Sequence, residues 1–206
     1  KAGIRTRVPD FETELVETPL LLEGPIEGVT IRPRWRRKQP VNAVMDCHLV
    51  LALVAVAREA RARGITEVLF YSTHRPPRKK RAGKRISQHR RALAIDIRWL
   101  ITGDGRTIDV LEHYDRHDGE PPCDAPADGD EARLLRDFAC ALHHQRIFNV
   151  VLTPNANKAH HNHFHFDITP DAVQIVVVQG DDGIGRVLER TEGLSLVPGQ
   201  PFHVTV

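Results

Sequence analysis

Residues 158–167 read KAHHNHFHFD, so four histidines fall within six positions. Side chains two positions apart on a β-strand share one face, so a strand here would point His163 and His165 one way and Phe164 and Phe166 the other. Such a strand would bury its phenylalanines in a core while its imidazoles line a polar site. Because imidazole is a common metal ligand, the cluster indicates a metal site that takes its remaining ligands from elsewhere in the chain.

The segment 87–96, SQHRRALAID, offers the missing ligands. A zinc site that carries out hydrolysis needs three protein ligands and one open position for water. His89 lies where a loop enters a predicted strand, and Asp96 lies within that strand. Taken alone, His89 is most simply a surface histidine in a basic loop. Its combination with Asp96 and with His165 of the later cluster makes these three residues candidate ligands.

The elements expected around these residues mix helices with strands. Asn42 is predicted to cap a helix that runs to Gly64, and a second helix is expected over Glu131–His144. Strands are predicted at 67–71, 93–99, 107–111, 147–152 and 163–168, and further short strands in VQIVVV, RVLE and PFHVTV. Because helices and strands do not alternate regularly, the pattern favours an α+β fold with a central, mostly antiparallel sheet and flanking helices.

A chain of 206 residues is long enough for one domain with its own core. Prolines are frequent in residues 1–40, which we expect to form an N-terminal arm. Alternatively, pieces of it at 18–22 and 28–31 pack on the main body. The main domain is placed at 41–170, and residues 171–206 are expected to add a C-terminal β extension.

The formal net charge is only +2, but the charge is unevenly spread. Residues 75–98 are strongly basic and 115–131 are acidic. The basic run is read as a solvated loop beside the site; it could instead hold phosphates of a nucleic acid or an anionic polymer. Only 5% of the residues are aromatic, which disfavours nucleic acid. A nuclease of the His-Asn-His type is disfavoured because a strand, not a helix, is expected after HHNH. No apolar run reaches the ~18 residues that a membrane span needs.

Four segments in the right order resemble the extensin-like C-terminal domain family of bacteria, which is similar to the zinc D-Ala-D-Ala carboxypeptidases and dipeptidases and the penicillin-insensitive murein endopeptidases. The segments are YSTHRP at 71–76, SQHRRALAID at 87–96, DGR at 104–106 and AHHNHFHFD at 159–167. The helix that carries Cys140 also resembles a helix of that family. The likeness covers roughly residues 41–170 and implies a fold of the zinc D-Ala-D-Ala peptidase type.

The resemblance implies that Zn²⁺ is held by His89, Asp96 and His165 and acts on peptide bonds of peptidoglycan. Arg75 and Ser87 would contact the substrate, the arginine through a carboxylate or carbonyl. His163 would stabilise charge on the tetrahedral intermediate, or would only orient the neighbouring ligand.

Asn162 departs from the pattern of the family, which has a carboxylate three positions before the last ligand. An amide cannot take a proton from a zinc-bound water, so the usual general base is missing. His160 matches a histidine of the murein endopeptidases and would substitute for it. The sequence therefore leaves two readings open: a zinc peptidase, and a weak or inactive zinc-containing module that binds cell wall or another anionic polymer.

The three cysteines are Cys47, Cys123 and Cys140. The family cysteine near residue 73 is replaced here, so the resemblance favours a disulfide between Cys123 and Cys140, the alternative being three reduced thiols. A disulfide would fit a periplasmic or extracellular protein. The chain shows neither a signal peptide nor an initiator Met, and we expect that an export signal has been trimmed. The sequence gives no indication of the oligomeric state.

Overall fold

The computed structural model describes residues 3–35, 40–76, 86–169, 175–179 and 185–190. Its main feature is an eight-stranded sheet in the order β11-β10-β8-β9-β6-β5-β3, with β7 paired to β6. The strands are β3 (Thr30–Pro33), β5 (Ile65–Phe70), β6 (Ala94–Thr102), β7 (Thr107–Asp109), β8 (Val150–Leu152), β9 (Phe164–Asp167), β10 (Ile175–Gln179) and β11 (Gly185–Arg190). Only the pairs β3/β5 and β8/β10 are parallel.

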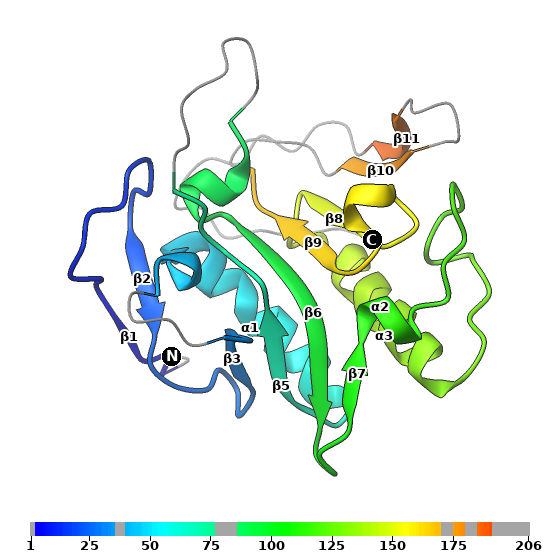
Figure 1. The fold of residues 1–206 in the computed structure, drawn as a ribbon, viewed down its shortest axis with the longest axis horizontal. Coiled ribbons are helices and arrows are strands. Elements are labelled where there is room, and N and C mark those ends of the chain that lie inside the picture. Colours follow the sequence, from blue (N-terminus) through cyan, green and yellow to red (C-terminus); the bar gives the residue numbers. More distant parts are fainter. Residues whose placement is uncertain (1–2, 36–39, 77–85, 170–174, 180–184, 191–206) are drawn as a thin grey trace, which may run out of the picture.

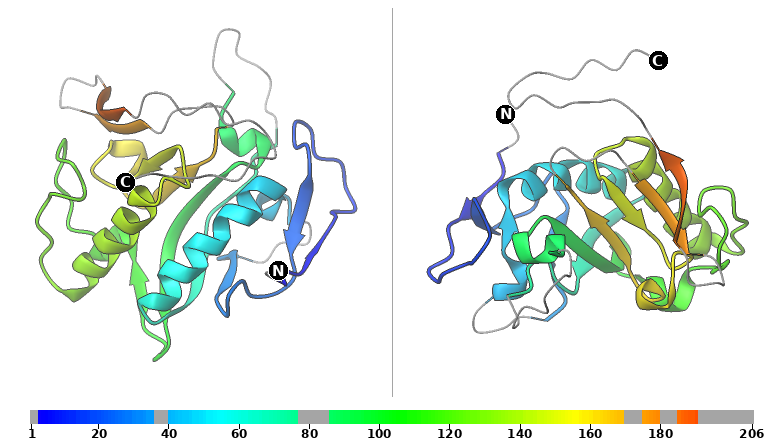
Figure 2. Two further views of the ribbon diagram at one scale, coloured as in Figure 1. Left: turned by 180° about the vertical axis from the view of Figure 1, so that it is seen from behind. Right: turned by 90° about the horizontal axis from the view of Figure 1, so that it is seen from above.

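Helices α1 (Cys47–Ala62) and α3 (Asp130–His144) lie side by side on one face of this sheet (Figures 1 and 2). A short helix α2 (Val110–His113) and three 3₁₀ turns, η1 (Val41–Ala43), η2 (Gln88–Arg91) and η3 (Lys158–His160), complete the helical elements of the described ranges. The predicted α+β fold with a mostly antiparallel sheet is confirmed. No helix in these ranges is both long and apolar enough to cross a membrane.

The N-terminal segment is joined to the rest of the structure by strand pairing. A smaller sheet has the order β1-β2-β4, built from β1 (Thr6–Arg7), β2 (Pro19–Leu22) and β4 (Met45–Asp46). Strand β3 pairs with β5 at an edge of the main sheet. The proposed division into three parts at residues 40 and 170 stays a prediction. Of the expected C-terminal strands, PFHVTV lies outside the described residues.

Helix α1 begins later than predicted. Its N-cap is Asp46, whose carboxylate accepts from the backbone N–H of His48 at 3.0 Å. Asn42 is therefore not the cap; its side-chain amide instead donates to the carbonyl of Tyr71 at 3.0 Å. The predicted end is right, because Gly64 adopts φ +70°, a left-handed conformation that costs glycine little.

Helix α3 agrees with the prediction to within one residue. Its buried side includes Leu135, Phe138 and Leu142, and a disulfide joins Cys140 to Cys123 in the acidic loop that precedes the helix. The predicted disulfide pairing is thus confirmed. Cys47 is a free thiol.

The strand predicted for residues 107–111 is shorter than expected. Strand β7 stops at Asp109, whose carboxylate accepts from the backbone N–H of Leu111 at 2.9 Å and so caps helix α2. The same carboxylate binds Arg98 of β6 through two hydrogen bonds, of 2.7 and 2.9 Å. Because Asp109 caps helix α2, the chain leaves the sheet two residues before the predicted end of the strand.

The two faces of β9 differ as the alternation of residues predicts. Phe164 and Phe166 are fully buried on the side of the helices, where Phe164 lies 6.4 Å from Phe138 of α3 between ring centroids. His165 lies on the opposite face, directly across from Asp96 in the antiparallel pairing of β9 with β6. Helix packing thus fixes the strand, and the strand presents its imidazole to the face opposite helices α1 and α3.

Candidate metal centre

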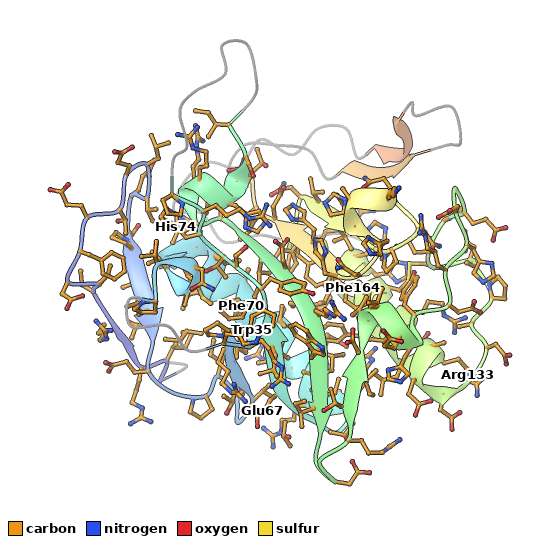
Figure 3. The ribbon with its side chains drawn as sticks, in the orientation of Figure 1. Trp35, Glu67, Phe70, His74, Arg133 and Phe164 are labelled. Carbon is orange, nitrogen blue, oxygen red and sulfur yellow. A yellow bond between two sulfur atoms is a disulfide. The ribbon has the colours of Figure 1, made fainter. Side chains whose placement is uncertain are left out.

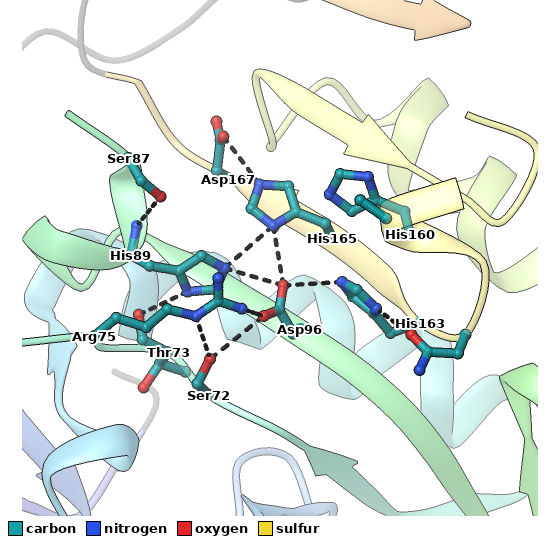
Figure 4. Close-up of polar contacts among 12 residues, drawn as sticks. Ser72, Thr73, Arg75, Ser87, His89, Asp96, His160, His163, His165 and Asp167 are labelled. Carbon is teal, nitrogen blue, oxygen red and sulfur yellow. Dashed lines mark hydrogen bonds and ion pairs between the residues drawn. The ribbon is translucent and has the colours of Figure 1, made fainter. Parts of the chain in front are cut away.

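Three ligand atoms meet on the face of the sheet opposite α1 (Figure 4). His89 Nε2 lies 3.0 Å from Asp96 Oδ1, His165 Nδ1 lies 3.0 Å from the same oxygen, and the two nitrogens are 3.2 Å apart. Asp96 and His89 are almost completely buried, at 1% and 2% exposure. The structure therefore brings together the three candidate ligands, two of which come from neighbouring strands and one from η2.

The hydrogen bonds on the far side of each ring decide which nitrogen faces the centre. His89 Nδ1 lies 3.2 Å from the carbonyl oxygen of Thr73, and His165 Nε2 lies 3.2 Å from a carboxylate oxygen of Asp167. Carbonyl and carboxylate oxygens only accept, so these nitrogens carry the protons of the neutral rings. Each ring then turns an unprotonated nitrogen, with its lone pair, towards Asp96.

This arrangement fits a cation in the centre. Without one, the lone pairs of His89, His165 and Asp96 would face each other at about 3 Å in a buried place, which is unfavourable. A tetrahedral ion with bonds of about 2.0–2.1 Å holds its ligand atoms about 3.3 Å apart, close to the separations observed. Two imidazoles and one carboxylate suit zinc and also other transition-metal ions. The residues therefore fit a divalent metal without fixing its identity.

The protonation equilibria indicate the same demand for positive charge. Burial opposes ionisation of Asp96, but the imidazoles of His163, His165 and His89, which can donate to this carboxylate when no ion lies between them, hold its pKa well below the usual value. Burial also disfavours a charged His165, yet hydrogen bonds to Asp167 and Asp96 raise its pKa to about 9. By contrast, burial lowers the pKa of His89 despite its bond to Asp96. In the absence of an ion, a proton on His165 supplies the charge that the carboxylates require.

The second oxygen of Asp96 is held by Arg75 and Ser72. Arg75 forms an ion pair with Oδ2 and donates through Nε to the hydroxyl of Ser72 at 3.2 Å, while Ser72 donates to Oδ2 at 3.3 Å. These contacts leave Oδ1 as the oxygen that faces the two histidines. The Arg75 side chain remains 56% exposed, so part of its guanidinium stays accessible to a bound molecule.

The segment that follows β5 is fixed in place by backbone bonds. Thr73 donates to the carbonyl oxygen of Asn42 through its N–H at 2.9 Å and to that of Val44 through its hydroxyl at 2.6 Å. The N–H of Arg75 donates to the carbonyl of His89 at 2.9 Å. Ser87 caps η2, its hydroxyl accepting from the N–H of His89 at 3.4 Å. In this structure Ser87 therefore positions a candidate ligand, and its predicted contact with substrate stays a prediction.

Of the other histidines in the cluster, His163 and His160 lie near the candidate ligands and His161 does not. His163 Nε2 lies 3.4 Å from Asp96 Oδ1, and the ring of His160 lies 5.2 Å from that of His163 and 5.5 Å from that of His165, between centroids. His161 is exposed, and its Nδ1 lies 2.7 Å from the carbonyl oxygen of Lys158. Three of the four histidines thus gather at the centre.

His160 and Asn162 occupy the positions that the sequence singled out for the general base. Burial and the charges of His165 and His163 lower the pKa of His160 to about 4, so its ring is neutral near pH 7. The Asn162 amide oxygen lies 2.8 Å from His163 Nδ1. Asn162 therefore contacts a histidine of the cluster.

Sequence reasoning did not identify Thr73, Ser72 or Asp167 as parts of the site. Asp167 follows His165 by two positions, so the two-residue period of a strand would have placed both side chains on one face. No such signal exists for Thr73, which acts through its backbone carbonyl. Contacts of that kind depend on the path of the loop and not on the residue type.

A second group of ligand types is formed by Asp46, Cys47 and His48 at the start of α1. Asp46 already accepts from the N–H of His48 and from that of Thr18, each at 3.0 Å. Its carboxylate is thus used by the helix cap, and the positive end of the helix dipole disfavours a cation there.

Comparison with known proteins gives one match. No curated protein and no solved structure matches the chain. The model of the family described as extensin-like protein C-terminus matches residues 15–176, which includes β2 and β3 as well as all the candidate ligands. A match over this much of the chain shows that the protein belongs to the extensin-like protein C-terminus family.

Proposed function

We propose that this protein is a zinc-dependent peptidase that hydrolyses peptide bonds in peptidoglycan stem peptides or cross-links. The observation that carries the proposal is the convergence of His89 Nε2, His165 Nδ1 and Asp96 Oδ1, which lie 3.0–3.2 Å from one another. Zinc bound there would polarise the scissile carbonyl and lower the pKa of a water to about 7. The substrate class is supported by the resemblance of the ligand segments, residues 87–96 and 163–165, to those of the zinc D-Ala-D-Ala peptidases.

Arg75 and His163 are assigned to substrate binding and charge stabilisation. The exposed part of the Arg75 guanidinium can donate to a carboxylate or carbonyl of the peptide while its other N–H groups hold Asp96. The His163 ring lies beside Asp96, with Nε2 3.4 Å from Oδ1, and in the tautomer that carries a proton on Nε2 it can donate to an oxyanion that develops on the scissile carbonyl.

His160 is assigned the role of general base. The Asn157 amide oxygen accepts from the backbone N–H of Ala159 at 2.9 Å and of His160 at 3.2 Å, which fixes the orientation of the amide. The same oxygen lies 2.8 Å from His160 Nδ1, so this nitrogen is the donor and Nε2 carries the lone pair. The neutral imidazole of His160 therefore presents Nε2 as a proton acceptor, although a weak one, because its pKa is about 4.

Asn162 favours a second candidate function, a zinc-containing module that binds the cell wall or another anionic polymer without cleaving it. Digestion of purified peptidoglycan by the zinc-loaded protein separates the two. We expect soluble peptide products from the wild type and their loss in His160→Ala. No product from the wild type, together with product from Asn162→Asp, would instead identify a site that has lost its base.

Metal binding is tested before activity. We expect one zinc per chain after dialysis, measured by elemental analysis, and its loss in His165→Ala. His161→Ala is the matched control, because His161 belongs to the same cluster but is exposed and lies outside the centre. Retention of stoichiometric zinc in His165→Ala would show that the ligand set is wrong.

We also propose that the protein acts in the periplasm or outside the cell. The disulfide between Cys123 and Cys140 supports this location, because such bonds persist in oxidising compartments. Fractionation of cells that express the full gene tests the proposal. Recovery of the protein in the cytoplasm, with both cysteines reactive towards alkylating reagents, would contradict it.

A further inference from the structure

An aromatic cluster lies next to the metal centre and has no part in the proposed chemistry. Trp35 and Tyr71 are stacked with ring centroids 5.8 Å apart and planes 25° apart, and Trp99 meets both rings edge-on at 5.5 and 5.0 Å. We call Trp35, Tyr71 and Trp99 the aromatic platform. Trp35 follows β3 (Figure 3), Tyr71 directly follows β5, and Trp99 lies in the middle of β6.

Arg98 and Asp109 support two rings of the aromatic platform, Tyr71 and Trp99. The guanidinium of Arg98 lies 4.8 Å from the ring centroid of Trp99 and 5.7 Å from that of Tyr71, and it donates to the Tyr71 hydroxyl. Asp109 binds Arg98 through two hydrogen bonds and also accepts from Trp99 Nε1 at 2.8 Å. These contacts hold Tyr71 and Trp99 in place before any ligand binds, and an ordered surface lowers the entropy that binding costs.

One ring of the platform, that of Trp35, is exposed to solvent. Trp35 is 54% exposed, whereas Trp99 is 8% exposed. An exposed indole that stacks on a second aromatic ring is typical of a recognition surface rather than of a core. The neighbouring Arg34 is also exposed; its guanidinium lies 5.7 Å from the centroid of Trp99, and no carboxylate in the described part of the chain pairs with it. A ligand with a flat apolar face and polar or anionic groups at its rim fits this combination.

The platform is continuous with the metal centre. The ring of Tyr71 meets that of His163 edge-on at 6.1 Å, and His163 in turn contacts Asp96. With the 5.8 Å step from Tyr71 to Trp35, the exposed indole lies within about 12 Å of the His163 ring. An extended peptide spans about 3.3–3.6 Å per residue, so three or four residues bridge this distance.

We propose that the aromatic platform binds a pyranose ring of the glycan strand to which the stem peptide is attached, an inference that rests on the proposed function. A pyranose presents C–H groups on its face, which pack on Trp35, and hydroxyl and acetamido groups at its rim, which can accept from Arg34. Cationic ligands are disfavoured by Arg34 and Arg98. Three or four extended residues of the stem peptide span the distance from this sugar to a peptide bond at the candidate metal centre. The preferred substrate is therefore glycan-linked peptide rather than free peptide.

Binding is tested without metal and without catalysis. The chain contains two tryptophans, both in the platform, so its two indole N–H signals in a ¹H–¹⁵N NMR spectrum report on this site. We expect saturable shifts of both signals on addition of the peptide-free disaccharide of N-acetylglucosamine and N-acetylmuramic acid. By calorimetry, Trp35→Ala should weaken binding about ten-fold, a loss typical of one buried aromatic contact, and Trp35→Phe should weaken it less. Leu51→Ala, at a large apolar residue of α1 that is 65% exposed, is the matched control and should bind as the wild type.

Activity gives the second readout. The zinc-loaded wild type should cleave the disaccharide-linked peptide with a kcat/KM about ten times that for the same peptide without sugar, and Trp35→Ala should bring this ratio towards one. Equal rates on both substrates, with no shift of the indole signals by the disaccharide, would overturn the inference while leaving the proposed peptidase intact. Cleavage of neither substrate, with the shifts present, would refute the peptidase and support the platform. Shifts produced by a single-stranded oligonucleotide or by self-association, and not by the disaccharide, would also overturn the inference.

Discussion

Asp167 provides the sharpest test of the metal centre because it touches the site without being a predicted ligand. Its Oδ2 lies 3.2 Å from His165 Nε2 and keeps the proton on that nitrogen, so Nδ1 is free to bind a metal. Removal of such a supporting carboxylate typically costs 10–100-fold in metal affinity. The Asp167 side chain is 12% exposed, so little water is available to replace the lost contact.

The two obvious substitutions should differ in size. Asp167→Asn keeps an oxygen that can accept from His165 but loses the charge, so we expect a loss of about ten-fold, or about 1.4 kcal/mol. Asp167→Ala loses the acceptor as well, and both tautomers of His165 become accessible; here we expect about 100-fold, or about 2.7 kcal/mol. The variants thus separate the effect of charge from that of orientation.

Zinc affinity is measured by competition with a chromophoric chelator at pH 7, and the zinc-induced rise in Tm is a second readout. Asp104→Asn is the matched control, because Asp104 is an exposed carboxylate in the turn between β6 and β7 and should leave zinc affinity unchanged. If Asp167→Ala binds zinc as tightly as the wild type, then His165 does not bind metal through Nδ1 and the geometric reasoning fails.

Three further predictions concern stability. Phe166→Ala should cost about 3–5 kcal/mol in the free energy of unfolding measured with urea, because the ring is fully buried, whereas the exposed Leu51→Ala should cost almost nothing; equal effects would contradict the assigned core. Replacing Cys123 and Cys140 together by serine should lower stability by about 3 kcal/mol, since the bridge closes a loop with a sequence separation of 17; an unchanged Tm would show that the bridge is not formed. Burial raises the pKa of Asp46, but hydrogen bonds from His48 and Thr18 outweigh it and lower this pKa below the usual 3.8. The charged carboxylate therefore stabilises the folded state above pH 3.8, and this contribution is lost as the pH falls through the lowered pKa. Asp46→Asn should therefore be less stable than the wild type at pH 7, and this difference should shrink as the pH falls below 3.8; a difference that does not change with pH would refute the assignment.

Much of the fold follows from local patterns that the sequence displays. The alternation in residues 163–167 correctly places phenylalanines in the core and His165 on the open face, because the pleat of a strand leaves no other arrangement once one face is buried. Gly64 correctly ends helix α1 because a left-handed residue is needed there. The start of that helix was predicted wrongly, since Asn42 and Asp46 are both good caps and only a tertiary contact, from Asn42 to Tyr71, decides between them.

The sequence likewise predicts some parts of the candidate site and not others. The segments of the family resemblance supply His89, Asp96 and His165, and the structure brings their ligand atoms within 4.8 Å of one another. The carbonyl of Thr73 and the packing of Trp35 on Tyr71 depend on how the chain returns after β5 and β3, which no local pattern encodes. Contacts between residues far apart in the chain and made by the backbone or by ring faces therefore required the structure.

The pairing of Asp96 with His165 has a consequence for how the protein folds. The two residues are 69 positions apart and sit directly opposite each other in the ladder between β6 and β9. A slip of one residue would turn His165 into the hydrophobic core and Phe166 into the site. A complete ligand set therefore exists only after this long-range strand pair has formed in the correct register, so the ion should bind late in folding. A metal that binds the proposed site would therefore stabilise only the correctly paired chain and would select it over chains with a slipped register.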